Sequence, residues 1–304
     1  MNIDVKMLAG RLADRMRLVS FELTPVHAHC AWPVFKGIAE GTTPVFVKLT
    51  ERDAAERSLA FLAAASGVCP FLPKPVMKEA LEFEGLAAIC TEWKEAVHVN
   101  AEDMTEGQLG AFAEGCRLLA KALSEYRGRI VPLSDEDSPA RQYDELRCYS
   151  LRHPIAGRLI RPLLEIPERE RSYGGRRLTA VHGDLQPRNY GFDGDRFAAV
   201  FDTDDITEGI ACEDPAYAFT ERVRRAELSA QSRRRLADMF CRMAEMSPWP
   251  KEDWIFALNR ARLRIAARRL ARHPDAAFVA FDIRRRDAPL RNFSDCVRRR
   301  FFLV

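Results

Sequence analysis

Residues 181–205, VHGDLQPRNYGFDGDRFAAVFDTDD, contain carboxylates, an amide and a histidine at short spacing. Carboxylates are costly to bury together unless a positive charge lies among them. Asp184, Asn189 and Asp202 offer hard oxygen atoms, the ligands that Mg²⁺ prefers in proteins. The stretch therefore predicts a site at which one carboxylate accepts a proton while an amide and a second carboxylate bind a divalent cation.

The first half of this stretch, HGDLQPRN, resembles the catalytic loop of protein kinases. Its matching residues are His182, Asp184, Leu185 and Asn189. Gly183 replaces the arginine of the kinase loop. In kinases the aspartate orients and deprotonates the attacking hydroxyl group, and the asparagine holds a magnesium ion. We therefore predict that Asp184 is a catalytic base, that Asn189 is a metal ligand and that His182 holds the loop backbone.

A second metal ligand is predicted at Asp202, thirteen residues after Asn189. The turn residues 193–195 separate two short apolar runs, YGF (190–192) and FAAVF (197–201), which predicts a β-hairpin. Because a hairpin brings the outer ends of its strands together, Asn189 and Asp202 are expected to share one Mg²⁺. This set suits phosphoryl transfer, which depends on positioning and charge neutralisation more than on covalent catalysis.

Lys48 lies in PVFVKLT, at the end of a predicted strand, as does the lysine that binds nucleotide phosphates in kinases. Glu56 follows eight residues later, within the helical pattern of residues 51–67. We predict that Glu56 forms an ion pair with Lys48 and orients it. Glu51, at the start of the same helix, is the alternative partner.

HGDLQPRN followed by VFDTDD resembles the aminoglycoside phosphotransferase and choline kinase family of small-molecule kinases. CEDPAYAFT (212–220) is similar to a further family motif, with Asp214 and Pro215 matching, and AAICTEWKEA (87–96) resembles the family's hinge. The resemblance covers most of residues 30–220. It implies an α+β, bilobal, protein-kinase-like fold, with Glu92 and Trp93 of the hinge at the nucleotide.

The resemblance implies an ATP-dependent phosphotransferase that moves the γ-phosphate to a hydroxyl group of a sugar, an amino alcohol or an aminoglycoside-like acceptor. ATP and Mg²⁺ are the implied cofactors. Lys48 is expected at the nucleotide phosphates. Asp204 and Asp205 either border the acceptor and metal site or are solvated turn residues.

Two departures from the family keep an alternative open. Segment 27–37, HAHCAWPVFKG, lacks the glycines of a loop that covers phosphates, and Ala218 stands where the family often has another aspartate. The alternative is a catalytically weak kinase-like protein that binds nucleotide or serves as a scaffold. A metal-dependent phosphohydrolase is a third interpretation, but the other five histidines are far from His182 and lack metal-ligand spacing.

These residues require two kinds of surrounding structure. Residues 1–93 predict a small N-lobe of strands around one main helix, with a hairpin at 34–50 and two more strands within 71–93. Residues 94–304 predict a larger helical C-lobe that carries the catalytic loop and the metal site. Thr105 and Gln108 predict a capping box for its first long helix, and Pro289 is expected to break the final helical segment in two.

Charge is unevenly distributed along the chain, although the net charge is only +3. Residues 1–93 have a net charge of −1, residues 94–215 of −7, and residues 216–304 of +11. The basic C-terminal region is either a set of solvated helix faces or a surface that contacts anionic ligands. No nucleic-acid partner is expected. The +11 region argues mildly against a polycationic acceptor, although the −7 segment could supply acidic walls for one.

The remaining sequence features favour a cytoplasmic protein. Eight cysteines lie far apart without a CxxC pair, so we expect reduced thiols, mostly in the core, and no zinc site. Charged residues interrupt the N-terminal segment, unlike a signal peptide, and no apolar run reaches the roughly 18 residues of a transmembrane helix.

Overall fold

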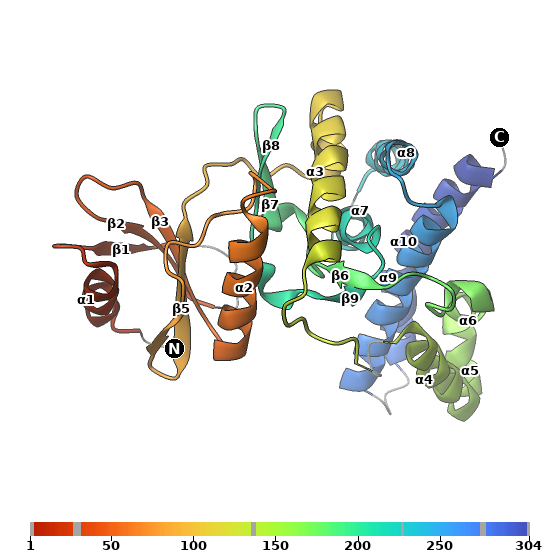
Figure 1. Ribbon diagram of the computed structural model, residues 1–304. Coiled ribbons are helices and arrows are strands. Elements are labelled where there is room, and N and C mark those ends of the chain that lie inside the picture. Colours follow the sequence, from red (N-terminus) through yellow and green to blue (C-terminus); the bar gives the residue numbers. More distant parts are fainter. Residues whose placement is uncertain (1–2, 27–31, 135–137, 226–227, 274–277, 303–304) are drawn as a thin grey trace.

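The computed structural model describes residues 3–26, 32–134, 138–225, 228–273 and 278–302. It has a five-stranded antiparallel sheet near the N-terminus and a mostly helical C-terminal part (Figure 1). This arrangement confirms the predicted α+β class, with a strand-rich first part and a helical second part. Segment 27–31, which includes Cys30 and part of the glycine-poor segment, lies outside the described residues.

The sheet has the strand order β1 (Glu22–Pro25), β2 (Val34–Ile38), β3 (Val45–Thr50), β5 (Leu86–Glu92) and β4 (Leu81–Phe83). The predicted hairpin at 34–50 is confirmed as β2 and β3. Lys48 lies on the central strand β3, opposite Val34 of β2 and Ile89 of β5. The lysine is therefore held by hydrogen-bonded backbone on both sides.

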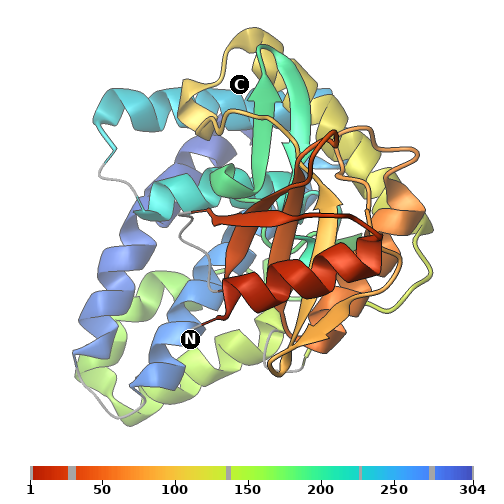
Figure 2. The same cartoon turned by 90° about the vertical axis from the view of Figure 1, so that its left-hand side faces the viewer.

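Two helices cover the two faces of this sheet. Alternate residues of β5 point to opposite faces: Cys90 belongs to the core that includes α1 (Val5–Met16), and Ile89 to the core that includes Leu59 of α2 (Arg52–Ala65). Figure 2 shows α1 crossing in front of the sheet. The predicted helix is α2. α1 is an additional helix that we did not predict, because charged residues interrupt the apolar residues of the N-terminal segment. Its buried residues form one face: Leu8, Ala9, Leu12 and Ala13.

α2 also joins the sheet to the C-terminal part. Phe61, Leu62 and Ala65 belong to the largest core cluster, which is built mainly from C-terminal helices. The Phe61 ring meets Tyr126 edge-on at 5.4 Å between ring centroids. Because α2 contributes to cores on both sides, the predicted division into an N-lobe of residues 1–93 and a C-lobe of residues 94–304 stays a prediction.

The C-terminal part is built around α3 (Glu106–Glu125) and two small strand pairs. The predicted capping box is confirmed: Thr105 accepts a hydrogen bond from the backbone of Gln108, and the Gln108 side chain accepts one from the backbone of Thr105. The predicted hairpin is confirmed as β7 (Tyr190–Asp193) and β8 (Arg196–Val200). The other pair is β6 (Thr179–Val181) with β9 (Thr207–Gly209).

The remaining helices form the side of the molecule away from the five-stranded sheet, at the right in Figure 1. They are α4 (Pro139–Arg152), α5 (Pro154–Gly157), α6 (Arg161–Leu164), α7 (Glu213–Arg225), α8 (Ala230–Met246), α9 (Lys251–Arg272) and α10 (Val279–Phe302). The predicted break at Pro289 is wrong, because α10 continues through it. Proline removes one helical hydrogen bond, but Leu290, Phe293 and Val297 continue the buried face of α10 into the main core.

The prediction that the cysteines lie mostly in the core is confirmed for the described residues. Their thiols are free, and five of them are buried: Cys69, Cys90, Cys116, Cys212 and Cys241. Burial raises the pKa of the Cys90 thiol to about 12. This thiol is therefore unreactive, because the thiolate is the nucleophilic form. Across the described ranges, each helix lacks either the length or the apolar character that a membrane span requires.

Phe61→Ala tests whether α2 joins the two parts of the molecule. The Phe61 side chain is fully buried, so its truncation is expected to lower the free energy of unfolding by about 3–5 kcal/mol. Val68→Ala, at a side chain that is 64% exposed just beyond α2, is the matched control and should change it by less than about 0.5 kcal/mol. Urea unfolding measures both, and equal losses would contradict the proposed packing.

Candidate active site

A cavity of about 610 Å³ lies between the sheet and the C-terminal part. Its walls come from β2 and β3, from the first turns of α2, from the connection after β5, from the loop after β6 and from the loop after β8. Seven of the predicted site residues line it: Lys48, Trp93, Asp184, Asn189, Asp202, Asp204 and Asp205. The structure thus brings together groups that are up to 157 positions apart in the chain.

The loop after β6 is anchored by buried Asp214 at the start of α7. Its carboxylate accepts hydrogen bonds from the backbone N–H groups of His182, at 2.7 Å, and Gly183, at 2.9 Å. The carbonyl of Phe201 accepts from His182 Nε2 at 2.8 Å, which leaves His182 Nδ1 to accept from the backbone N–H of Asp184. Both ring nitrogens of His182 therefore hold backbone, which agrees with the predicted structural role.

Asp184 is fixed by its neighbours in the same loop. The side chains of Gln186 and Asn189 both donate to its Oδ2, and the Asn189 amide also donates to its carbonyl at 2.8 Å. The Arg188 guanidinium lies 4.0 Å from the same oxygen. The amide hydrogens of Asn189 are thus used on Asp184, and the amide oxygen is the atom of Asn189 that can bind a cation.

Gly183 explains why this loop lacks the arginine of the protein-kinase motif. Its φ is +81°, in the left-handed region that favours glycine. A Cβ atom at this position would lie 2.7 Å from the carbonyl oxygen of Asp205, which is closer than real Cβ contacts. Glycine is therefore required where the catalytic loop passes the loop after β8.

Lys48 connects the sheet to the loop after β8. Its side chain is buried and forms ion pairs with Asp202 and, at 2.7 Å, with Asp204. Thr50 also donates to Asp204, at 3.0 Å. Burial acts to lower the pKa of Lys48, but the charges and hydrogen bonds of Asp204 and Asp202 outweigh it and raise that pKa. Lys48 is therefore held as a cation.

The predicted ion pair between Lys48 and Glu56 is not formed. Glu56 instead accepts from Arg52 at 2.9 Å, on a solvent-exposed part of α2. The reason is geometric: β3 ends at Thr50 and α2 begins at Arg52, so Glu56 is only one turn into the helix and lies beside Arg52. Glu51, the alternative partner, lines the cavity, but the ion-pair partners of Lys48 are Asp202 and Asp204.

The predicted hinge residues have different positions. Trp93 lines the cavity; its Nε1 donates to Glu95 at 2.7 Å, and the Lys36 ammonium lies 4.5 Å from the centre of its ring system. Glu92 lies at the end of β5 and pairs with Lys94 at 3.2 Å, beside the cavity rather than among its lining residues. Contact of Glu92 and Trp93 with a nucleotide stays a prediction.

The two last acidic residues of the stretch differ in environment. Asp204 is buried against Lys48 and is not a solvated turn residue, whereas Asp205 is exposed at the cavity. Partial desolvation of its carboxyl group by the surrounding cavity wall, together with the charges of Asp202, Asp204 and Asp184, raises the pKa of Asp205. Negative charge has therefore accumulated at this side of the cavity, where a bound cation would offset it.

The donor set fits Mg²⁺ of the kinase type. Among the described residues, no group of three acidic, histidine or cysteine side chains could hold a metal by itself. Mg²⁺ bound together with phosphates needs only one or two protein carboxylates, because phosphate and water complete its coordination. The Asn189 amide oxygen and the Asp202 carboxylate, which is 35% exposed, meet that need.

Some residues around the predicted site were not singled out from the sequence. Gln186 orients Asp184, and Arg188 and Arg57 line the cavity. Gln186 and Arg188 occupy variable positions of the catalytic-loop motif, so the motif carries no signal for them. Arg57 follows Glu56 on α2, and its guanidinium donates to the carbonyl of Asp204 at 3.4 Å.

Gly183→Ala is expected to destabilise the protein through both backbone strain and the clash with Asp205. The left-handed backbone alone costs roughly 1–2 kcal/mol for a residue with a Cβ. Gly175→Ala is the matched control, because φ there is +76° and no atom lies within 4 Å of the added Cβ. Thermal unfolding should show a clearly lower midpoint for Gly183→Ala than for Gly175→Ala. Equal midpoints would mean that the loop relaxes without cost.

Comparisons with known proteins agree with this geometry. A family model described as the phosphotransferase enzyme family (APH) matches residues 36–255. No curated protein matches the chain. An aminoglycoside phosphotransferase from Alicyclobacillus acidocaldarius has a similar structure, with a TM-score of 0.63, 13% identity and coverage of 92% of this chain and 93% of that one.

Two other solved structures share the fold. One is an amicoumacin kinase in complex with AMP-PNP, Ca²⁺ and Ami, with a TM-score of 0.61, 13% identity and coverage of 96% of this chain and 93% of the other. The second is macrolide 2′-phosphotransferase from Brachybacterium faecium, with a TM-score of 0.56, 15% identity and 97% coverage of both chains. These likenesses confirm the predicted bilobal, protein-kinase-like fold. The family model matches more than half of this chain. The chain therefore belongs to the phosphotransferase enzyme family of small-molecule kinases, whose phosphate acceptor is an alcohol group.

Proposed function

We propose that this protein transfers the γ-phosphate of ATP to a hydroxyl group of a small molecule, with Asp184 as the catalytic base. One observation carries the proposal: Lys48, Asp184, Asn189 and Asp202 line the same cavity between the sheet and the helical part. Phosphoryl transfer needs these groups around one set of phosphates, because its catalysis consists mainly of positioning and charge stabilisation.

The nucleotide occupies the cavity of about 610 Å³, a volume typical of small-molecule sites. Phe46 and Trp93, whose rings lie 6.4 Å apart, offer an apolar wall for the base. Lys48 binds the phosphates. Asp204 positions Lys48 in the way first expected of Glu56, since Asp204 is the buried carboxylate that accepts from the lysine and from Thr50.

Asn189 and Asp202 would hold Mg²⁺. The ion supplies positive charge that neutralises the phosphate oxygens during transfer. Asp202 is suited to this position because its pKa is lowered: burial acts to raise it, but the charge and hydrogen bond of Lys48 prevail. The carboxylate therefore stays ionised at neutral pH.

Asp184 accepts the proton of the acceptor hydroxyl as its oxygen attacks the γ-phosphorus atom. Gln186 and Asn189 both donate to Oδ2, so they fix the plane of the carboxylate. We assign Oδ1 to the acceptor hydroxyl. The bond from the γ-phosphorus to the bridging oxygen of ATP breaks, ADP leaves, and the acceptor keeps the phosphoryl group.

Asp184→Asn is expected to abolish transfer while nucleotide binding remains, because asparagine keeps the shape of the side chain but cannot accept the proton. Loss of a general base typically costs about 10²- to 10⁴-fold in rate. The measurement is ADP release with a panel of sugars, amino alcohols and aminoglycosides. Asp193→Asn, at an exposed residue of the β7–β8 hairpin, is the control and should keep full activity. Full activity of Asp184→Asn would exclude the assigned role.

Mg²⁺-dependent stabilisation by ATP tests the nucleotide and metal site without any acceptor. A ligand that binds only the folded state raises the free energy of unfolding, by about 2.7 kcal/mol at a ligand concentration of 100 Kd. The midpoint temperature of unfolding rises with it. The wild type should show this rise with Mg²⁺ and ATP together. Asn189→Ala and Asp202→Ala should lose its Mg²⁺ dependence, whereas Asp193→Asn should retain it. A wild type that ATP does not stabilise would favour the scaffold alternative.

A further inference from the structure

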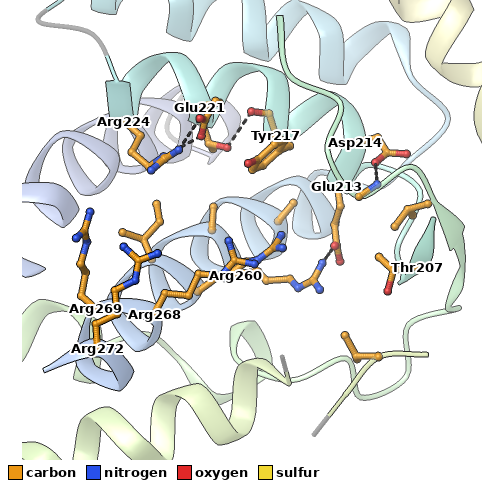
Figure 3. A pocket seen from close by; sticks show the side chains of 18 residues that line it. Thr207, Glu213, Asp214, Tyr217, Glu221, Arg224, Arg260, Arg268, Arg269 and Arg272 are labelled. Atoms are coloured by element: carbon orange, nitrogen blue, oxygen red, sulfur yellow. Dashed lines mark hydrogen bonds and ion pairs between the residues drawn. The ribbon is translucent and has the colours of Figure 1, made fainter. Parts of the chain in front are cut away.

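A second cavity, of about 200 Å³, lies on the other side of the catalytic loop, between α7 and α9. Gly183, the residue before the proposed base, and Asp214, which anchors the loop, both line it. Figure 3 shows Arg268, Arg269 and Arg272 extending from α9 toward α7. The proposed nucleotide site leaves this cavity without a function.

Positive charge dominates its lining. Six arginines contribute to it: Arg224, Arg260, Arg264, Arg268, Arg269 and Arg272. Its three carboxylates are already engaged within the protein: Glu213 pairs with Arg260, Glu221 pairs with Arg224 at 2.5 Å, and Asp214 accepts from the catalytic-loop backbone. The lining therefore has twice as many guanidinium groups as carboxylates.

Four of the arginines recur at every fourth residue of α9, from Arg260 to Arg272, and so share one helix face. Like charges at this spacing destabilise a helix by roughly 0.2–0.5 kcal/mol per pair. Burial and the charges of Arg286, Arg272 and Arg224 lower the pKa of Arg269, despite its ion pair with Asp282. Such mutual repulsion would be relieved by a bound anion.

Arg264 lies in the middle of this row and is half-buried. In the described part of the chain its buried Nε atom finds no hydrogen-bond acceptor. A buried donor without a partner costs free energy, which a ligand oxygen would recover. Guanidinium groups in a row are suited to the planar, bidentate binding of phosphate and carboxylate oxygens.

The cavity is electrostatically linked to the proposed base. Burial acts to lower the pKa of Arg224, but Glu221, Tyr217 and also Asp184 raise it. Burial, Glu221 and Asp184 also raise the pKa of Tyr217 to about 12, so its hydroxyl stays neutral. A ligand in this cavity is thus within reach of the electric field of Asp184.

We propose that this cavity binds the acceptor, and that the acceptor carries a phosphate or carboxylate group on the molecule whose hydroxyl is phosphorylated. The anionic group binds the α9 arginines, and the hydroxyl is directed from the Gly183 part of the cavity lining toward the neighbouring Asp184. This inference rests on the proposed function and names its substrate class. A polycationic aminoglycoside is excluded from this cavity by the same charges.

The volume agrees with this assignment. Sites for drug-sized ligands span about 300–1,000 Å³, and this cavity is smaller, at about 200 Å³. It therefore accommodates a compact metabolite, or the anionic end of a larger one. Asp214 and Arg272 lie on opposite sides of the lining (Figure 3).

The test compares four ligands of one carbon skeleton: glucose 6-phosphate, glucuronate, glucose and glucosamine, with inorganic phosphate as a fifth probe. The readout is the shift of the unfolding midpoint in the presence of Mg²⁺ and ADP. We expect the anions to stabilise the wild type, and glucose and glucosamine to have no effect. Whether phosphate or carboxylate gives the larger shift identifies the anionic group.

The variant Arg264→Gln/Arg268→Gln should weaken binding of the anions about 10- to 100-fold, the loss expected when charge-assisted hydrogen bonds are removed. Arg284→Gln/Arg285→Gln, at exposed residues of α10, removes the same charge outside the cavity and should bind them normally. Three results would each overturn the inference. Glucosamine could stabilise the protein as much as the anions do, anion binding could survive Arg264→Gln/Arg268→Gln, or no anion could stabilise the protein. Stabilisation by Mg²⁺ and ATP is measured in parallel, and its loss in the wild type would instead reject the proposed function.

Discussion

The structure depends on one buried cation, the ammonium group of Lys48, held between Asp202 and Asp204. Burying a lone charge is prohibitive, and removing one partner of a buried ion pair typically costs about 3–5 kcal/mol. Lys48 belongs to the central strand of the sheet, whereas both aspartates follow β8 in the C-terminal part. The ion pairs therefore fix the sheet relative to the proposed metal ligands, and this defines the shape of the cavity between them.

α2 supports the same junction through packing and neutral hydrogen bonds. Ser58 and Thr203 share a hydrogen bond of 2.6 Å, and Phe61 packs into the core of the helical part. The catalytic loop is fixed independently, by the Asp214 carboxylate and by His182. Lys48 and Asp184 thus reach the cavity from two separately stabilised supports, which suits a reaction in which positioning provides most of the catalysis.

The fold places the negatively and positively charged segments of the chain at two different cavities. The segment with net charge −7 supplies Asp184, Asp202, Asp204 and Asp205 to the first cavity, and the segment with net charge +11 supplies the arginines of the second. Gly183, which lines the second cavity, directly precedes Asp184, which lines the first. One cavity is suited to a cation with nucleotide phosphates, and the other to an anionic group on the acceptor.

The sequence by itself determined what local spacing encodes. HGDLQPRN and the hairpin after it place Asp184, Asn189 and Asp202 on one short segment, and the capping box at Thr105 needs only neighbouring residues. Tertiary structure alone decided which groups meet across the chain. Asp204 replaced Glu56 beside Lys48, because the short connection from β3 to α2 turns Glu56 toward solvent. α10 passes through Pro289, because its buried face outweighs one lost hydrogen bond. The arginines of α9 are an ordinary basic helix in the sequence and line a cavity only because α7 packs against them, a contact that no local pattern specifies.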